Sequence, residues 1–186
     1  MKRARKIVLI SHCYLNVNAK IEGIALNSSV FEDLIQFLIK NHYGIIQLPC
    51  VEQHVCGIKR WGQVSNQLDN PHFRSECRRL LEPVVEQVID FKNNGYEIIG
   101  VIGVNGSPSC GVDYTCVGNL CGDFENENEL KNKLSSVKME NKYGIMMEEL
   151  KKLFIKNDLD INFVALDEAD PEDINEYLSK KLINKN

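Results

Sequence analysis

The sequence predicts an α/β protein, built as a three-layer, mostly parallel open sheet with helices on both faces. Short β-branched apolar runs alternate along the chain with segments in which apolar residues recur at helical spacing. One run, residues 96–104, is apolar almost throughout, which is typical of a strand covered on both faces. The 186 residues, 44% of them hydrophobic and 26% charged, have a globular composition. We therefore expect residues 1–186 to form a single α/β domain, with a basic N-terminal extension at 1–5.

The first half of the chain predicts a strand, a helix and a second strand. Residues 6–11 form the first apolar run, and Ser29 and Glu32 have the spacing of a capping box at the start of a helix. Gly44 is expected to end that helix, and residues 45–48 are expected to form the second strand. This order is that of a β-α-β unit, in which the two strands run parallel.

The second half of the chain continues the alternation. Asn70 and Pro71 have the pattern of a cap and a first helical residue, and they predict a long helix that reaches Gly95. Pro83 is expected to divide this helix in two, because proline removes one helical hydrogen bond. Residues 96–104 then predict the central strand of the sheet. The remaining expected elements are a helix at 144–156, a strand at 161–166 and a final helix that opens with Asp170 and Pro171.

The charge and the apolar runs exclude several classes of protein. A formal net charge of -4 gives no overall basic field, so no nucleic-acid partner is expected. No apolar run approaches the about 20 residues that cross a membrane, and the run after the basic residues 1–6 is too short for a secretory signal. The seven cysteines are therefore expected to stay reduced in the cytoplasm, where thiols serve metal binding or catalysis.

Three of the cysteines follow predicted strands. Cys13 comes after the first strand, Cys50 after the second and Cys110 after the central strand. Because the carboxyl ends of parallel strands meet at one edge of a sheet, we expect these thiols to share one cleft. Three thiolates without an obvious fourth protein ligand suit zinc, or an iron–sulfur cluster that keeps one open iron.

The segments around these cysteines resemble the signatures of a known family. They read SHCYLN at residues 11–16, LPCVE at 48–52 and GSPSCG at 106–111. In order and spacing they are similar to the motifs of the thiouracil desulfidase family, and the resemblance covers roughly residues 6–115.

The resemblance implies a cofactor, a reaction and a set of site residues. Members of that family hold a [4Fe-4S] cluster through three cysteines, which here would be Cys13, Cys50 and Cys110. The open fourth iron takes the sulfur of a small thiocarbonyl substrate, which is hydrolysed without net redox. Glu52 matches the acidic residue of the family's second motif and Ser107 matches the first serine of its third motif, so both are expected to be catalytic.

This chain also departs from the family pattern. Val51 stands where proline is usual, and residues 18–23 differ from the common form, which indicates a divergent branch and leaves the thio-substrate unidentified. Two other functions stay open. One is a zinc or iron–sulfur binding or sensor protein without catalysis, and the other is a hydrolase with a cysteine nucleophile that uses His12 or His54.

Several candidate residues have a structural alternative. Glu52 could be the base that deprotonates water, or a solvated loop carboxylate. Ser107 and Ser109 could bind the substrate or cluster sulfur, or only form a turn. Arg60 and Trp61 could contact a planar base, or anchor their own loop.

The remaining cysteines have weaker signals. Cys77 falls within the predicted long helix and is expected in the core. Cys116 and Cys121 could be a redox pair, a second metal site or two solvent-facing thiols, and Cys56 has no assigned role.

A long polar segment, residues 111–142, follows the third cysteine. Loops of this length in compact proteins are usually functional or disordered. We expect it to fold over the cleft as a lid, although its density of Asn, Glu and Lys favours a disordered excursion.

Overall fold

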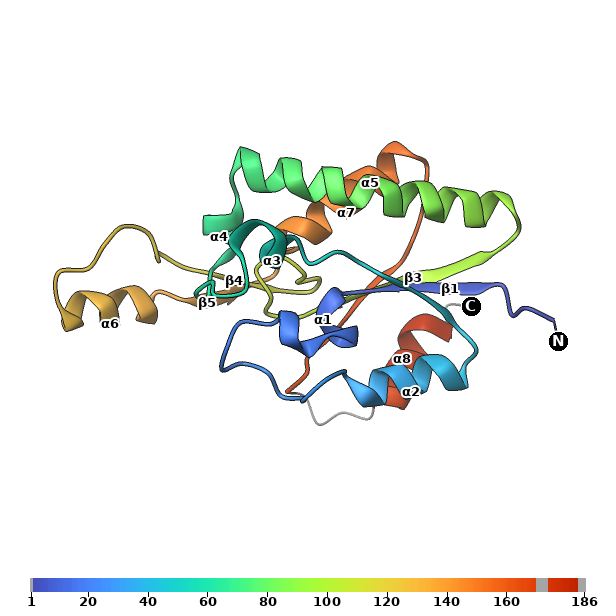
Figure 1. Ribbon diagram of the computed structural model, residues 1–186, viewed down its shortest axis with the longest axis horizontal. Helices are drawn as coiled ribbons and strands as arrows, with labels where there is room; N and C mark the ends of the chain where they lie inside the picture. Colours follow the sequence, from blue (N-terminus) through green and yellow to red (C-terminus); the bar gives the residue numbers. More distant parts are fainter. Residues whose placement is uncertain (1, 170–173, 184–186) are drawn as a thin grey trace.

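The computed structural model describes residues 2–169 and 174–183, and its centre is a four-stranded sheet (Figure 1). The strands are β1 (Lys6–Ile10), β2 (Gly44–Gln47), β3 (Glu97–Val104) and β6 (Phe163–Leu166), in the order β2-β1-β3-β6. All three neighbouring pairs are parallel. The predicted parallel α/β sheet is therefore confirmed, and β3 lies in its interior as expected.

Helices cover both faces of this sheet. α5 (Pro71–Asn93) and α7 (Ile145–Lys156) pack together on one face, while α2 (Glu32–Lys40) and α8 (Ile174–Leu178) pack together on the other (Figure 1). A short π-helical turn (Ser179–Ile183) follows α8. The layers enclose the apolar side chains of the inner strands, among them Val8, Leu9, Ile10, Val101 and Ile102.

The start and the end of α2 differ from expectation. The helix begins at Glu32 with Phe31 at the cap, and the predicted capping box is wrong because no side chain caps this end. The backbone N–H of Phe31 instead donates to the carbonyl of Tyr14. This bond links the start of α2 to the segment that follows β1. The helix ends at Lys40, where Asn41 Nδ2 donates to a helix carbonyl, so Gly44 opens β2 rather than ending α2.

The long helix α5 is continuous through Pro83, so the predicted division is wrong. Its start is as expected, because Asn70 Oδ1 accepts from the Phe73 backbone N–H at 3.0 Å. Loss of a helical bond at proline costs about 3 kcal/mol. The buried face of the helix continues on both sides of Pro83, and each large apolar side chain that it buries is worth about 1.5–3 kcal/mol.

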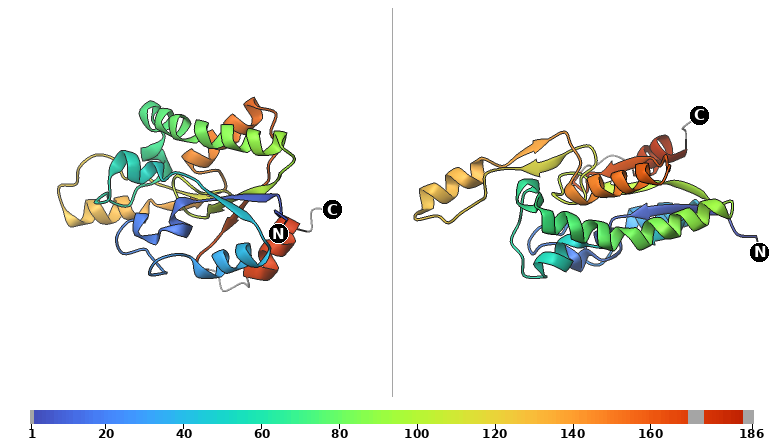
Figure 2. Two further views of the ribbon diagram at one scale, coloured as in Figure 1. Left: turned by 45° about the vertical axis from the view of Figure 1, so that its right-hand side comes forward. Right: turned by 90° about the horizontal axis from the view of Figure 1, so that it is seen from above.

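The polar segment 111–142 is an ordered arm rather than an irregular loop. It contains β4 (Thr115–Val117), α6 (Glu127–Ser135) and β5 (Lys138–Glu140), and the two strands pair antiparallel. The part of the arm around α6 extends away from the sheet in every view, whereas Val112 at its start is buried in the core (Figures 1 and 2). Its polarity reflects solvent exposure, since no residue of α6 is buried.

Two further expectations concern the start of the last helix and the lack of a membrane-spanning segment. The predicted start of the last helix, Asp170-Pro171, lies outside the described residues. In the part of the chain that the structure describes, every helix is too short or too polar to cross a membrane.

Candidate functional site

The three strand-end cysteines line one cavity of about 280 Å³. Cys13 lies in α1 (His12–Leu15) directly after β1, and Cys50 is the N-cap residue of α3 (Val51–Cys56) after β2. Cys110 lies in the loop that follows β3. The prediction that these thiols meet at the carboxyl edge of the sheet is thus confirmed.

Close backbone contacts hold the loop that carries Cys110. A Cβ atom on Gly103 of β3 would lie 2.6 Å from the Cys110 carbonyl oxygen, and one on Gly144 would lie 2.7 Å from the Ser109 carbonyl oxygen. Both glycines therefore permit an approach that alanine would block. Within the loop, Ser107 Oγ accepts from the Cys110 backbone N–H at 3.0 Å. The backbone that carries the Cys110 thiol therefore packs against the sheet on one side and the start of α7 on the other.

Burial and mutual proximity shape the chemistry of the three thiols. Burial raises the pKa of Cys13, and the neighbouring Cys110 thiol adds to this effect. Burial likewise raises the pKa of Cys110 to about 12 and raises that of Cys50, which accepts from the Gln53 backbone N–H. The metal-free thiols therefore hold their protons at neutral pH. These buried thiols would lose their protons only beside a positive charge that stabilises the thiolate, such as a bound metal.

The arrangement of the donor groups bears on which kind of metal site could form here. Among the described residues, no group of three or more His, Cys, Asp or Glu side chains is arranged to hold a single metal ion. In a [4Fe-4S] cluster each cysteine binds a different iron. The ligands of a cluster therefore lie farther apart than the ligands of a single metal ion. Three cysteines around one cavity fit such a cluster.

Glu52 is buried and fully engaged. Its Oε1 accepts from Arg60 Nε at 2.7 Å, and its Oε2 accepts from Ser109 Oγ at 3.1 Å. The alternative of a solvated loop carboxylate is therefore wrong. Arg60 also donates to the carbonyl of Ala19, so it anchors two segments and holds Glu52, whereas Trp61 is 90% exposed and does not line the cavity.

The two serines have different neighbours. Ser107 lines the cavity, and its hydroxyl lies 3.4 Å from that of Ser109 while it also caps the turn at Cys110. Ser109 links this turn to Glu52. Both serines therefore combine turn formation with a place at the cavity.

Sequence reasoning assigned no role to three polar residues of the cavity wall, Lys20, Gln63 and Glu168. Lys20 and Glu168 form an ion pair, and each side chain is only 8% exposed. Glu168 follows β6, so the strand-end rule that identified the cysteines also points to it. No local pattern in the sequence distinguishes Gln63, and Cys116, which the sequence left with several possible roles, also lines the cavity.

The remaining cysteines separate by location. Cys77 is buried in α5, as expected. Cys116, on β4, lines the cavity and donates to the Gln63 carbonyl, whereas Cys121 is exposed on the arm and contacts Asn119. Cys116 and Cys121 thus lie in different environments.

The histidines proposed as partners of a nucleophile lie elsewhere. Neither His12 nor His54 lines the cavity, and His54 Nε2 lies 3.2 Å from Glu76 Oε2. Burial lowers the pKa of His12. The cysteine-nucleophile hypothesis therefore has no base beside its thiol among these two residues.

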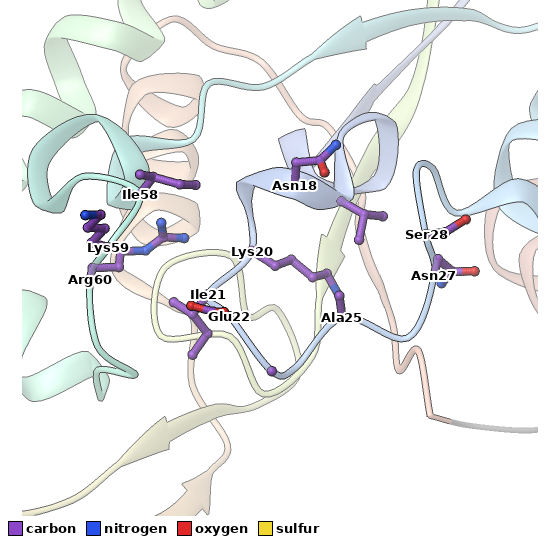
Figure 3. A pocket seen from close by; sticks show the side chains of 12 residues that line it. Asn18, Lys20, Ile21, Glu22, Ala25, Asn27, Ser28, Ile58, Lys59 and Arg60 are labelled. Carbon is purple, nitrogen blue, oxygen red and sulfur yellow. The ribbon is translucent and has the colours of Figure 1, made fainter.

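A wider groove of about 620 Å³ lies next to the cavity and shares Lys20, Ile21 and Arg60 with it (Figure 3). Residues 17–28 form one side of this groove and residues 58–60 the other. The arm contributes only Cys116 to the cavity lining, so the expected lid at 111–142 does not cover the site. Ala19, Lys20, Ile21 and Ile24 contribute to the cavity wall instead.

Fold and site together define a parallel α/β protein with a cysteine-lined cavity at the carboxyl edge of its sheet. The chain is 32% identical over 155 residues to the uncharacterized protein MJ0003 of Methanocaldococcus jannaschii, a match that covers 81% of this chain and 98% of the relative. The chain belongs to the family of that protein. No protein-family model and no solved structure matches it.

Proposed function

We propose that the protein is an iron–sulfur-dependent, non-redox desulfidase that acts in the cytoplasm on a small thiouracil-like heterocycle. The observation that carries the proposal is the lining of one cavity by Cys13, Cys50 and Cys110, each from a different strand end. The resemblance of the three cysteine motifs to the thiouracil desulfidase family supports the same reading.

The three cysteines would hold a [4Fe-4S] cluster, and each thiol would lose its proton when the cluster binds. When bound, such a cluster supplies an open iron that acts as a Lewis acid toward the thiocarbonyl sulfur. The overall reaction converts C=S and water into C=O and hydrogen sulfide, so no electron is gained or lost by the substrate.

The protein's own groups would handle water and its proton. Glu52 takes a proton from the attacking water, while Arg60 and Ser109 fix the direction of its two oxygens. Ser107 lines the same cavity and offers a hydroxyl for the substrate. The burial of Glu52 keeps this step out of bulk water.

Anaerobic reconstitution tests the proposal directly. Wild-type protein should bind iron and acid-labile sulfide and release sulfide from thiouracil. Each of Cys13→Ser, Cys50→Ser and Cys110→Ser should lose most of the iron, whereas Cys121→Ser, a matched change on the exposed arm, should keep it. Full iron content in any of the three variants removes that residue from the site.

A second function, a cluster-bearing sensor without catalysis, is favoured by one observation. Cys116 is the fourth cysteine in the cavity lining, and four cysteines would leave no open iron. The variant Cys116→Ser separates the two functions. A sensor with four ligands would lose its cluster, whereas the proposed desulfidase would keep both its iron and its activity.

A further inference from the structure

Two buried oxygen atoms of residues that line the cavity have no hydrogen-bond partner. They are Oε1 of Glu168 and Oε1 of Gln63. Buried acceptors in proteins almost always have a donor. Two unpartnered acceptors at one cavity therefore indicate that the cavity receives a ligand with donors.

The carboxylate of Glu168 is held in place on one side. Its Oε2 pairs with Lys20, and both side chains are more than nine-tenths buried. Glu168 follows β6 and Lys20 follows the 3-10 helix η1 (Val17–Ala19), so the pair joins a strand end to the segment that borders the groove. Because one oxygen is fixed by Lys20, the other is an acceptor of defined position.

The rest of the wall offers apolar contact. Ile21, Ile24, Val104 and Pro108 line the same cavity. A pocket with apolar walls and a few fixed polar groups favours a ligand with apolar faces and polar edges. A thioamide ring has both, because its faces are apolar and the nitrogen beside the C=S group carries an N–H.

We infer that Glu168 and Gln63 determine specificity by accepting hydrogen bonds from the ring N–H groups of a thioamide heterocycle. The inference rests on the proposed function, which supplies the thiocarbonyl substrate. It adds that the protein recognises the ring N–H groups of that substrate. A ring without N–H would leave both acceptors buried and unpaired. Sites that hydrogen-bond a ligand reject analogues that lack the donor more strongly than apolar sites reject a change in size.

Binding of oxygen analogues tests this inference without any chemistry. Calorimetry compares uracil, which has two ring N–H groups, with 1,3-dimethyluracil, which has none, on protein whose iron content is measured in parallel. Uracil should bind at least about ten-fold more tightly. Equal affinities, or no binding of uracil to iron-loaded protein, would overturn the inference.

Variants assign the preference to the two residues. Gln63→Leu should reduce the preference for uracil about ten-fold, and Gln63→Glu, which keeps an acceptor, should retain it. Glu168→Leu should also reduce it, and Lys20→Met, which removes the group that fixes the carboxylate, should reduce it as well. Gln36→Leu, on the exposed face of α2, is the matched control and should change nothing.

The two proposals can fail separately. Iron content and sulfide release report on the cluster and the reaction, whereas the preference for uracil reports on Glu168 and Gln63. If every variant, Gln63→Leu and Glu168→Leu included, kept the wild-type preference, these residues would not read the ring, even in a protein that releases sulfide.

Discussion

Arg60 connects three segments at or near the cavity wall. Its Nε donates to Glu52, its Nη2 to the carbonyl of Ala19 and its Nη1 to the carbonyl of Gly57. One guanidinium therefore sets the position of the proposed base and of the segment that borders the groove. Lysine has no planar fork and could not make these three contacts together.

Replacement of Glu52 by Gln should separate chemistry from cofactor binding. The amide keeps the size of the side chain and cannot take a proton, so sulfide release should fall by about 10²-fold or more. Iron content should stay near that of the wild type, because Glu52 is not one of the proposed ligands. Activity assays and iron analysis on the same preparation check this prediction.

Glu86→Gln, on the exposed face of α5, is the matched control and should leave both quantities unchanged. Undiminished turnover in Glu52→Gln would exclude Glu52 as the base.

Single residues also show how far the sequence alone could lead. Cys13, Cys50 and Cys110 could be predicted as neighbours because each follows an apolar strand, and the strand-end rule needs no knowledge of side-chain contacts. The ion pair of Lys20 with Glu168 could not, since its partners are far apart in the chain and nothing local to either residue specifies the other.

At the scale of elements, the loop after β3 depends on two places where backbone lies directly on backbone. Gly103 sits under Cys110, and Gly144 sits against Ser109 where α7 begins. The N–H of Gly144 also donates to the Gly111 carbonyl at 2.9 Å. The strand, the loop and the helix therefore position the thiol as one unit.

The variant Gly103→Ala should destabilise the protein and reduce iron binding together. The new methyl group would lie 2.5 Å from a Val112 side-chain carbon and 2.6 Å from the Cys110 carbonyl, and the backbone must move to relieve this. Such overpacking typically costs about 1–3 kcal/mol. Thermal unfolding and iron analysis measure the two effects.

Gly62→Ala provides the comparison, because its nearest contact is the flexible end of Ile21 at 3.3 Å. A Gly103→Ala protein with wild-type unfolding temperature would show that this contact is easily relieved.

Helices α5 and α7 are joined by charged groups as well as by apolar packing. Glu149 of α7 is buried and accepts hydrogen bonds from Arg74 and Arg78 of α5 and from Lys152. Burial raises the pKa of Glu149, but the bonds from Arg78, Lys152 and Arg74 outweigh it, so the pKa lies below its usual value. The carboxylate is thus stabilised in its charged form.

This lowered pKa predicts an acid-dependent loss of stability. The contribution of Glu149 is present above the pKa of glutamate in the unfolded chain, about 4.3, and is lost as the pH falls through the lower folded value. At pH 7, Glu149→Gln should lower the free energy of unfolding by about 1–3 kcal/mol, and the difference from wild type should shrink below about pH 4.

Urea unfolding at a series of pH values measures this difference. Glu127→Gln on α6 is the control, because its ion pair with Lys131 is exposed and should contribute about 0–1 kcal/mol. A difference for Glu149→Gln that grows toward low pH would contradict the assignment.

At the scale of the whole molecule, the structure divides into a layered body and a projecting arm (Figure 2). The alternation of apolar runs was sufficient to predict the body, because buried strands and amphipathic helices leave that pattern. The arm could not be predicted in this way. Its strands have three residues each and its helix has no buried face, so it leaves no periodic apolar signal.

Deletion of residues 126–133 from the arm should leave the site intact. These residues do not line the cavity, and α6 projects away from the four-stranded sheet (Figure 1). Iron content and the KM for a thiopyrimidine should stay within about two-fold of the wild-type values, as is usual for changes in exposed, peripheral segments. A large rise in KM would indicate that the arm closes on the site when substrate binds.

The position of the cysteines at strand ends has a consequence for the order of events during synthesis. The first of the three leaves the ribosome long before the last, and residue 13 has no cavity to line until the strand that ends near residue 104 has paired beside it. Such non-local pairing is slow to form compared with local structure. A chain halted before residue 110 would therefore carry two of the three proposed ligands without the third, so we expect insertion of the proposed cluster to follow completion of the sheet.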